Sequence, residues 1–154
     1  MLKTTLRSLC LAALGLAVST STFAADEIVE KASPHSVTKT LDRLQAILTK
    51  KGITVFARID HAEGAKKVGL TLSDNQVLIF GNPKLGTPVM KAEPRVGLDL
   101  PMKVQAFADA EGKVWVRYAR PAAMAARHGG TGPAKIITKM TGALDKLTDA
   151  ATAR

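Results

Sequence analysis

The segment from Met102 to Ala119 constrains the fold most, because its pattern is that of two strands joined by a tight turn. Aliphatic residues alternate with polar or aromatic ones on both sides of Asp109-Ala110-Glu111-Gly112, and a period of two is typical of strands with two different faces. A three-residue loop with Gly112 in the left-handed conformation places Phe107 opposite Trp115. The chain is therefore expected to contain an antiparallel sheet with one aliphatic face.

Three other segments are expected to form strands. Ile53 to Ile59 alternates strictly, whereas Gln76 to Phe80 is apolar on both sides and should lie centrally in the sheet. Glu27 to Lys31 is expected at an edge. Asp60 to Gly69 is interpreted as a polar loop or short helical turn, and Gly81-Asn82-Pro83 as the turn that ends its strand.

The helices have clear start and stop signals. A helix is predicted after the N-cap Ser36, ending at Gly52, because one apolar stripe has helical spacing: Val37, Leu41, Leu44, Ile47 and Leu48. Thr87-Pro88 is expected to start a short helix. The tail from Pro121 is predicted to be helical, with a break at Gly129 to Pro133. This order of elements predicts an α+β fold, a two-layer sandwich.

Residues 1 to 24 are typical of a cleaved signal peptide. Lys3 and Arg7 precede an apolar run from Leu9 to Val18, and small residues lead to a cleavage site after Ala24. The mature protein is therefore expected to be soluble and periplasmic, with no transmembrane segment. We divide the chain into the signal peptide, an α+β domain over 25–120, and a C-terminal helical extension over 121–154 that packs on the domain.

The composition of the mature chain excludes several kinds of site. Cys10 is the only cysteine and leaves with the leader, so structural disulfides and thiolate chemistry are excluded. Without Lys3 and Arg7 the formal charge falls from +9 to +7. Such a basic protein is attracted to anionic surfaces. The basic residues are dispersed along the chain, so nucleic acid is not expected as a partner.

Three blocks carry a resemblance to a known family. They are Gly52 to Ala62 (GITVFARIDHA), Val77 to Lys84 (VLIFGNPK) and Leu98 to Lys103 (LDLPMK). They resemble the bacterial and archaeal family called domain of unknown function 302, in the family's order and over about Lys31 to Pro121. The resemblance implies a curved, mainly antiparallel sheet with helices on one face, similar to the TATA-box-binding-protein class in a β-α-β4-α arrangement. It implies no established reaction.

Strand alternation also predicts a candidate binding face. If the aliphatic residues meet the helices, the aromatic and basic residues share the other face of the sheet. They are Phe56, Arg58, Phe107, Trp115 and Arg117. On this face Gln105 is expected opposite Arg117. Aromatic rings offer stacking area and guanidinium groups bind carboxylate or phosphate. The same aromatics could instead pack under the C-terminal helix or across a homodimer interface. Asn82, in the turn after its strand, is a further candidate ligand-binding residue.

A second candidate site surrounds His61. This histidine follows Asp60 at a strand end, and Asn82 and Asp99 also lie near strand ends, where sites are often assembled. His61, Asp60 and Asp99 are weak catalytic candidates, because no spacing of nucleophile, base and acid accompanies them. No histidine spacing supplies a second metal ligand, so neither a metal nor a cofactor is expected.

The sequence therefore favours a periplasmic, non-enzymatic domain. It would bind a small anionic or amphiphilic molecule, or a partner protein, through the aromatic and basic sheet face. A small metal-binding or enzymatic protein centred on His61 is the alternative. A homodimer that covers the aromatic face is a third possibility.

Overall fold

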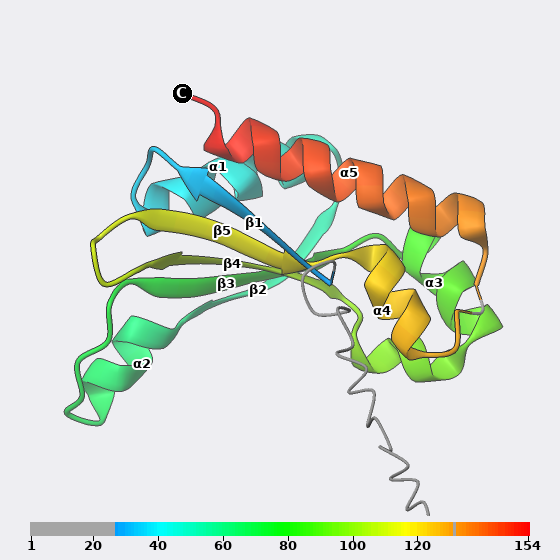
Figure 1. Cartoon of the computed structure of the whole chain (residues 1–154), viewed down its shortest axis with the longest axis horizontal. Helices are drawn as coiled ribbons and strands as arrows, with labels where there is room; N and C mark the ends of the chain where they lie inside the picture. The colour runs from blue at the N-terminus through cyan, green and yellow to red at the C-terminus, as the bar shows by residue number, and fades with distance from the viewer. Residues whose placement is uncertain (1–26, 131) are drawn as a thin grey trace, which may run out of the picture.

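The computed structural model describes residues 27–130 and 132–154, so the predicted signal peptide lies outside the described residues. Five antiparallel strands form one open sheet in the order β1-β5-β4-β3-β2 (Figure 1). They are β1 (Ile28–Ser33), β2 (Thr54–Asp60), β3 (Asn75–Gly81), β4 (Met102–Ala108) and β5 (Val114–Ala119). The predicted α+β class and antiparallel sheet are confirmed.

The hairpin of β4 and β5 has the predicted register. Phe107 pairs with Trp115 and Gln105 pairs with Arg117. The Asp109 amide donates to the Lys113 carbonyl at 3.0 Å, which leaves a three-residue loop. Gly112 has a φ of +77°, the left-handed conformation that glycine adopts without steric cost.

Strand β2 does not alternate as predicted. Val55 pairs with Phe80 and Ala57 pairs with Ile79, so Phe56 is the extra residue of a β-bulge. A bulge shifts the alternation by one residue, and Arg58 then pairs with the buried Leu78. The prediction that Arg58 lies on the face opposite Val55 is therefore wrong.

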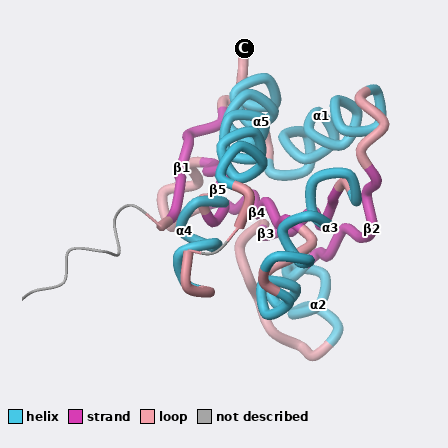
Figure 2. Tube along the Cα trace, turned by 90° about the vertical axis from the view of Figure 1, so that its right-hand side faces the viewer, coloured by secondary structure: helices cyan, strands magenta, loops and turns pink. Residues whose placement is uncertain are grey.

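Two long helices cover one face of the sheet. They are α1 (Val37–Lys50) and α5 (Ala134–Thr152), which lie side by side above the strands in Figure 2. Ser36 is the N-cap of α1, as predicted, and its hydroxyl accepts from the Lys39 amide. The stripes of both helices meet the aliphatic face of the sheet in a first core that includes Leu41, Leu48, Leu78, Val104, Val116 and Leu144.

A second core lies beyond the end of the sheet. It joins α5 to α3 (Pro83–Ala92), the 3-10 helix η2 (Pro94–Leu98) and α4 (Pro121–Arg127), through residues that include Val89, Val96, Met124, Ile137 and Met140. The tail is helical with a break, as predicted. No helix within the described ranges has both the length and the hydropathy needed to cross a bilayer.

Helix α3 begins earlier than its sequence pattern suggests. The Asn82 side chain caps it, accepting from the Lys84 amide at 2.9 Å, and Pro83 occupies the first turn. Thr87-Pro88 therefore lies inside the helix, and the prediction that it starts one is wrong. Asparagine before proline is a strong helix start as well as a turn signal, and here the helix continues past Pro88.

Candidate functional site

A pocket of about 420 Å³ lies at the seam between the two cores. Its lining includes Phe80, Leu144 and Leu147, which belong to the first core. Met140 and Leu85 come from the second core and the residues packed against it. The volume is within the range of small-molecule sites, about 300–1,000 Å³.

The bulge in β2 supplies one wall of the pocket. Phe56 lines it and is 57% exposed, an unusual state for a phenylalanine. The ring approaches the backbone at Gly81, where an added Cβ would meet Phe56 Cε2 at 3.3 Å and Pro101 Cβ at 3.4 Å. Gly81 therefore leaves the space that the Phe56 ring uses.

Helix α3 and the residues around the start of β4 supply a second wall. Leu85, Gly86 and Met90 face the pocket from α3, while Leu100 and Met102 face it from the other segment. An added Cβ at Gly86 would lie 3.7 Å from Leu100 and 3.9 Å from Met90, which is ordinary contact. This wall is thus apolar and includes two unbranched, adaptable methionine side chains.

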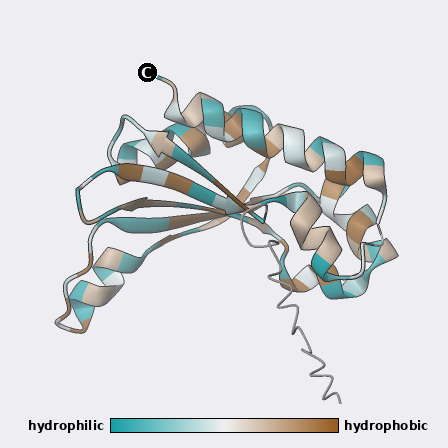
Figure 3. Cartoon of the chain, viewed as in Figure 1, coloured by the Kyte–Doolittle hydropathy of each residue, from teal (hydrophilic) through white to brown (hydrophobic). Residues whose placement is uncertain are grey.

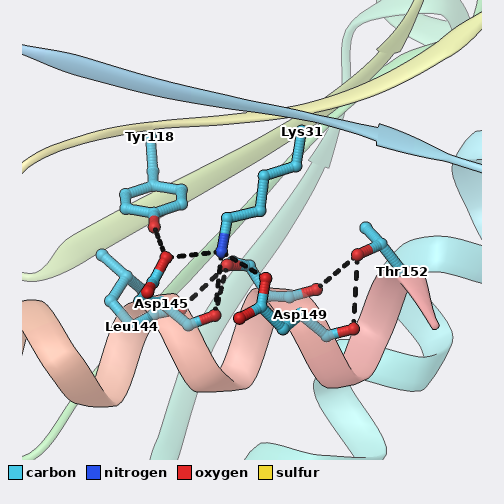
Figure 4. A network of polar contacts seen from close by, with 7 residues as sticks. Lys31, Tyr118, Leu144, Asp145, Asp149 and Thr152 are labelled. Atoms are coloured by element: carbon cyan, nitrogen blue, oxygen red, sulfur yellow. Dashed lines mark hydrogen bonds and ion pairs between the residues drawn. The ribbon is translucent and has the colours of Figure 1, made fainter.

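Helix α5 covers the pocket and is fixed by an ionic network on its far side (Figure 4). The Lys31 ammonium lies 2.6 Å from one carboxylate oxygen of Asp145 and 2.6 Å from one of Asp149. Burial opposes the charge on Lys31, but these hydrogen bonds outweigh it and raise the Lys31 pKa. The hydrogen bond from Lys31 also lowers the pKa of Asp145.

Two polar side chains interrupt the apolar lining. They are Asn82 and Thr87. Asn82 uses its Oδ1 as the α3 cap, and no protein partner is seen within the described part of the chain for its amide NH₂ or for the Thr87 hydroxyl. Both groups are available to orient a polar atom of a ligand.

No ionisable side chain is among the described residues that line the pocket. The lining therefore offers neither a general base nor a counter-ion for a charged group. It suits a ligand with an apolar body and one hydrogen-bonding head.

The predicted aromatic and basic residues are divided between two places. Phe107, Trp115 and Arg117 lie on the face of the sheet opposite the first core, as their pairing with Glu30 and Ala32 in the ladder indicates. They do not pack under the C-terminal helix. Phe56 lies apart from them, in the wall of the pocket.

The polar groups of the open face are engaged within the protein. Trp115 Nε1 donates to Asp109 at 2.7 Å, and the Lys113 ammonium lies 3.9 Å from the centroid of the indole ring. Gln105 donates to Asn75 at 3.0 Å. These contacts stabilise the hairpin.

Arg58 has a structural environment on the helix side of the sheet. Its guanidinium donates to Asp42 at 2.6 Å in α1 and to Gln76 at 2.7 and 2.9 Å in β3. Gln76 in turn donates to Asp60 at 2.8 Å. Arg58 and Asp60 therefore join β2 and β3 to α1, and neither lines the pocket.

The polar residues of the second predicted site do not come together. His61 starts α2 (His61–Lys67) where β2 ends, whereas Asn82 follows the end of β3. Because these neighbouring strands are antiparallel, their carboxyl ends lie at opposite ends of the strand pair. The expected proximity of His61 to Asn82 and Asp99 is therefore wrong.

Asp99 has a different partner, which the sequence did not reveal. Its carboxylate lies 2.7 Å from His128 Nε2 and 3.2 Å from Arg127 Nη2, so it joins η2 to α4. Sequence distance hid this contact, since 29 residues separate Asp99 from His128. Within the described residues, no group of three or more acidic, histidine or cysteine side chains is placed to hold a metal ion.

The pocket itself was also missed, although Phe56 and Asn82 were both named as binding residues. The only available signal was the cluster of glycine and proline around Asn82. That cluster is typical of a turn, and it predicts no cavity.

Proteins from Brucella are similar in sequence to part of this chain. The protein named fluoride-specific ion channel FluC 1 of Brucella suis is 44% identical over 101 residues, which are 66% of this chain and 40% of the relative. The protein of the same name from Brucella abortus is also 44% identical over 101 residues, 37% of its length. The chain thus spans about two fifths of the curated relatives it matches.

A solved structure supports the fold, and a family model supports the ancestry. The uncharacterized conserved protein DUF302 from Bacillus stearothermophilus superimposes with a TM-score of 0.65 at 17% identity, over 81% of this chain and 94% of that one. The model described as domain of unknown function DUF302 matches residues 29–147, which include α4 and most of α5. The chain belongs to the DUF302 family.

Proposed function

We propose that the protein is a non-enzymatic binding domain that takes a small amphiphilic molecule into the pocket under α5. The observation that carries this proposal is the pocket's composition, which combines an apolar lining with only Asn82 and Thr87 as polar side chains. Small-molecule sites commonly pair a mainly apolar lining with a few polar groups that set orientation. The exposed ring of Phe56 is the residue best placed to meet such a ligand.

The lining also favours one kind of head group. An anionic head would enter without an opposing charge, because the described lining lacks lysine and arginine. Burying an unpaired charge is costly, whereas a neutral hydroxyl or amide can bond to Asn82 and Thr87. Of the anionic and amphiphilic ligands that the sequence suggested, we therefore favour an uncharged amphiphile.

The compartment is part of the same proposal. The pattern of residues 1 to 24 supports export, so we infer that the ligand is met in the periplasm. Mass spectrometry of the exported protein should find Ala25 at its N-terminus. An intact Met1 would contradict export.

A panel with one alkyl chain and different heads tests the site. We expect decanol to bind more tightly than decanoate or decylamine, measured by calorimetry. Ala143→Phe places a ring in the pocket from α5 and should weaken decanol binding at least about tenfold, by excluding the ligand from the apolar space.

Ala150→Phe is the matched control, because Ala150 is an exposed residue of the same helix and lies outside the pocket. It should leave decanol binding unchanged. Equal binding by both variants, or no binding of any alkyl compound by the unaltered protein, would contradict the proposal.

A second candidate function is binding of a partner protein or a second copy through the open face. It is supported by the Phe107 and Trp115 pair, which lies on that face beside the turn of the β4–β5 hairpin. Trp115→Glu should then dissociate the complex, as seen by light scattering. If the unaltered protein is monomeric at high micromolar concentration, the homodimer is contradicted.

A further inference from the structure

Helix α2 and the turn after it form a protrusion with an apolar tip. Figure 1 shows them projecting from the sheet at the end away from α3 and α4. None of the residues of α2 is buried. The three aliphatic residues of the turn are all exposed: Val68 by 71%, Leu70 by 66% and Leu72 by 46%. Figure 3 shows hydrophobic colour at the tip of this loop. We call Val68 to Leu72 the apolar turn.

Backbone geometry holds these side chains outward. The Leu70 amide donates to the Ala65 carbonyl and the Gly69 amide to the Lys66 carbonyl, with Gly69 at a φ of +75°. This pair of bonds is the Schellman cap of α2. Backbone hydrogen bonds therefore fix the conformation of the apolar turn.

The same cap at the end of α1 has the opposite outcome. The Ile53 amide donates to Leu48 and the Gly52 amide to Thr49, with Gly52 at a φ of +66°. Ile53, the counterpart of Leu70, packs against the first core. An apolar residue at this position usually has a contact of this kind. Leu70 is 66% exposed and has no comparable cover within the described residues, so its side chain is accessible to a partner.

Charges along the protrusion are segregated. Asp60 and Asp74 lie at its base, where the chain leaves β2 and rejoins β3, and Glu63 is in the first turn of α2. Lys66 and Lys67 are in the last turn, next to Val68. The tip thus combines cations with aliphatic side chains.

We propose that the apolar turn inserts into the surface of an anionic lipid bilayer, with Lys66 and Lys67 at the level of the headgroups. Aliphatic insertion and lysine attraction to anionic lipid act together at such surfaces. The formal charge of +7 that remains without residues 1–24 adds to the attraction. A second copy is a poorer occupant, because three side chains offer far less than the roughly 800 Å² per partner of a stable interface.

This site is separate from the pocket. Phe56 lines the pocket, and Asp60, at the base of the protrusion, comes four residues later in β2. At about 3.3 Å a residue, these two positions are roughly 13 Å apart, and the apolar turn lies beyond Asp60. A protein held by the apolar turn would leave its pocket open on the side away from the bilayer.

Sedimentation with vesicles tests the proposal. The exported chain, beginning at Ala25, should bind vesicles of phosphatidylglycerol with phosphatidylcholine, and bind phosphatidylcholine alone more weakly. Combined Val68→Ser, Leu70→Ser and Leu72→Ser should lower partitioning about a hundredfold. Combined Lys66→Gln and Lys67→Gln should lower it about twentyfold at low salt and less at high salt.

Leu98→Ser is the matched control, because Leu98 is 84% exposed and lies in η2 at the other end of the molecule. It should bind vesicles like the unaltered chain. All variants begin at Ala25, because the apolar run from Leu9 to Val18 would itself bind vesicles and mask the losses. The replaced side chains are exposed, and circular dichroism should show an unchanged fold.

Three results would overturn the proposal: no vesicle binding by the unaltered chain, equal binding by the triple serine variant, or an equal loss in Leu98→Ser. A dimer that the triple variant dissociates, without vesicle binding, would assign the turn to a second copy instead. Decanol binding by the triple variant should be unchanged, so failure here is distinct from failure of the pocket.

Discussion

The two cores of this protein differ in what fills them and in what holds them. The first packs leucine and valine of α1, α5 and the sheet, as Leu41, Leu48, Val104 and Val116 illustrate. The second is built between helices and contains Met124 and Met140. Methionine fills irregular space and adapts its shape, whereas branched residues pack in fixed rotamers. The difference explains why the pocket lies at the edge of the second core.

The hydrogen bonds and ion pairs that hold the helices of the two cores differ as well. On the first core, Arg43 donates to the carbonyls of Ala150, Ala151 and Ala153, which fixes the C-terminal end of α5. Lys31 holds the same helix to β1. On the second core, α4 is held to η2 by Asp99 through His128 and Arg127. The comparison predicts that the first core is rigid and that the second core deforms more easily.

The largest expected effect compares the filled interior of the first core with its border at the pocket, by one type of substitution. Leu41→Ala should lower the free energy of unfolding by about 3–5 kcal/mol, because it leaves a cavity in filled space. Leu144→Ala should cost about 1–2 kcal/mol, because Leu144 already borders the pocket and loses fewer contacts. Urea denaturation measures both. Equal losses would contradict a difference in packing.

Next in size is the tie between Lys31 and α5. Lys31→Met should cost about 1–2 kcal/mol near neutral pH, since the exposed carboxylates limit the gain from the pair. Asp145 contributes stability above its ordinary pKa of 3.8, lost as the pH falls through its lowered folded value. Lys31 contributes below 10.5, lost as the pH rises through its raised value.

Chemical denaturation across pH should therefore show a flatter curve for Lys31→Met at both extremes. Lys146→Met, at an exposed residue of the same helix, is the control and should leave the curve unchanged. If the free energy of unfolding of Lys31→Met fell at acid and alkaline pH as it does in the unaltered protein, this network would not anchor α5.

A smaller effect is expected at the tie of the second core. Asp99→Ala removes the acceptor of His128 and Arg127, and should cost about 1 kcal/mol. Amide hydrogen exchange should quicken in α4 and remain unchanged in β3 and β4. Asp74→Ala, at an exposed acid beside the sheet, should alter neither region. Faster exchange throughout the sheet would contradict two separable cores.

The smallest effects concern the two glycines of the pocket. Gly86→Ala should stabilise the protein by about 0.4–1 kcal/mol, because its Cβ fits beside Leu100 and alanine favours a helix. Gly81→Ala should destabilise it by a similar amount, since its Cβ would press on Phe56 and Pro101. Thermal denaturation would contradict this account if both changes shifted the melting temperature in the same direction.

Local patterns predicted much of the fold. The stripe of α1, its Ser36 cap and the register of β4 with β5 depend on neighbours in the sequence, and all are confirmed. The bulge at Phe56 has no such signal, because it depends on how β2 pairs with β3. One extra residue was enough to move Arg58 to the other side of the sheet.

The candidate site depended still more on tertiary contacts. Phe56 and Asn82 were identified as binding residues from their chemistry, yet the walls of their pocket come from α3, α5 and the start of β4. Leu85 and Ala143 have no feature that sets them apart from core residues. Only the meeting of distant segments turns such residues into a cavity.

The methyl resonances of the methionines test the central claim most directly. Met90, Met102 and Met140 line the pocket, whereas Met124 is buried in the second core and does not. When decanol is titrated into methyl-labelled protein, we predict chemical-shift changes for those three methyl groups and none for Met124. Unchanged methyls at all three pocket positions, or an equal change at Met124, would contradict a ligand site at the seam of the two cores.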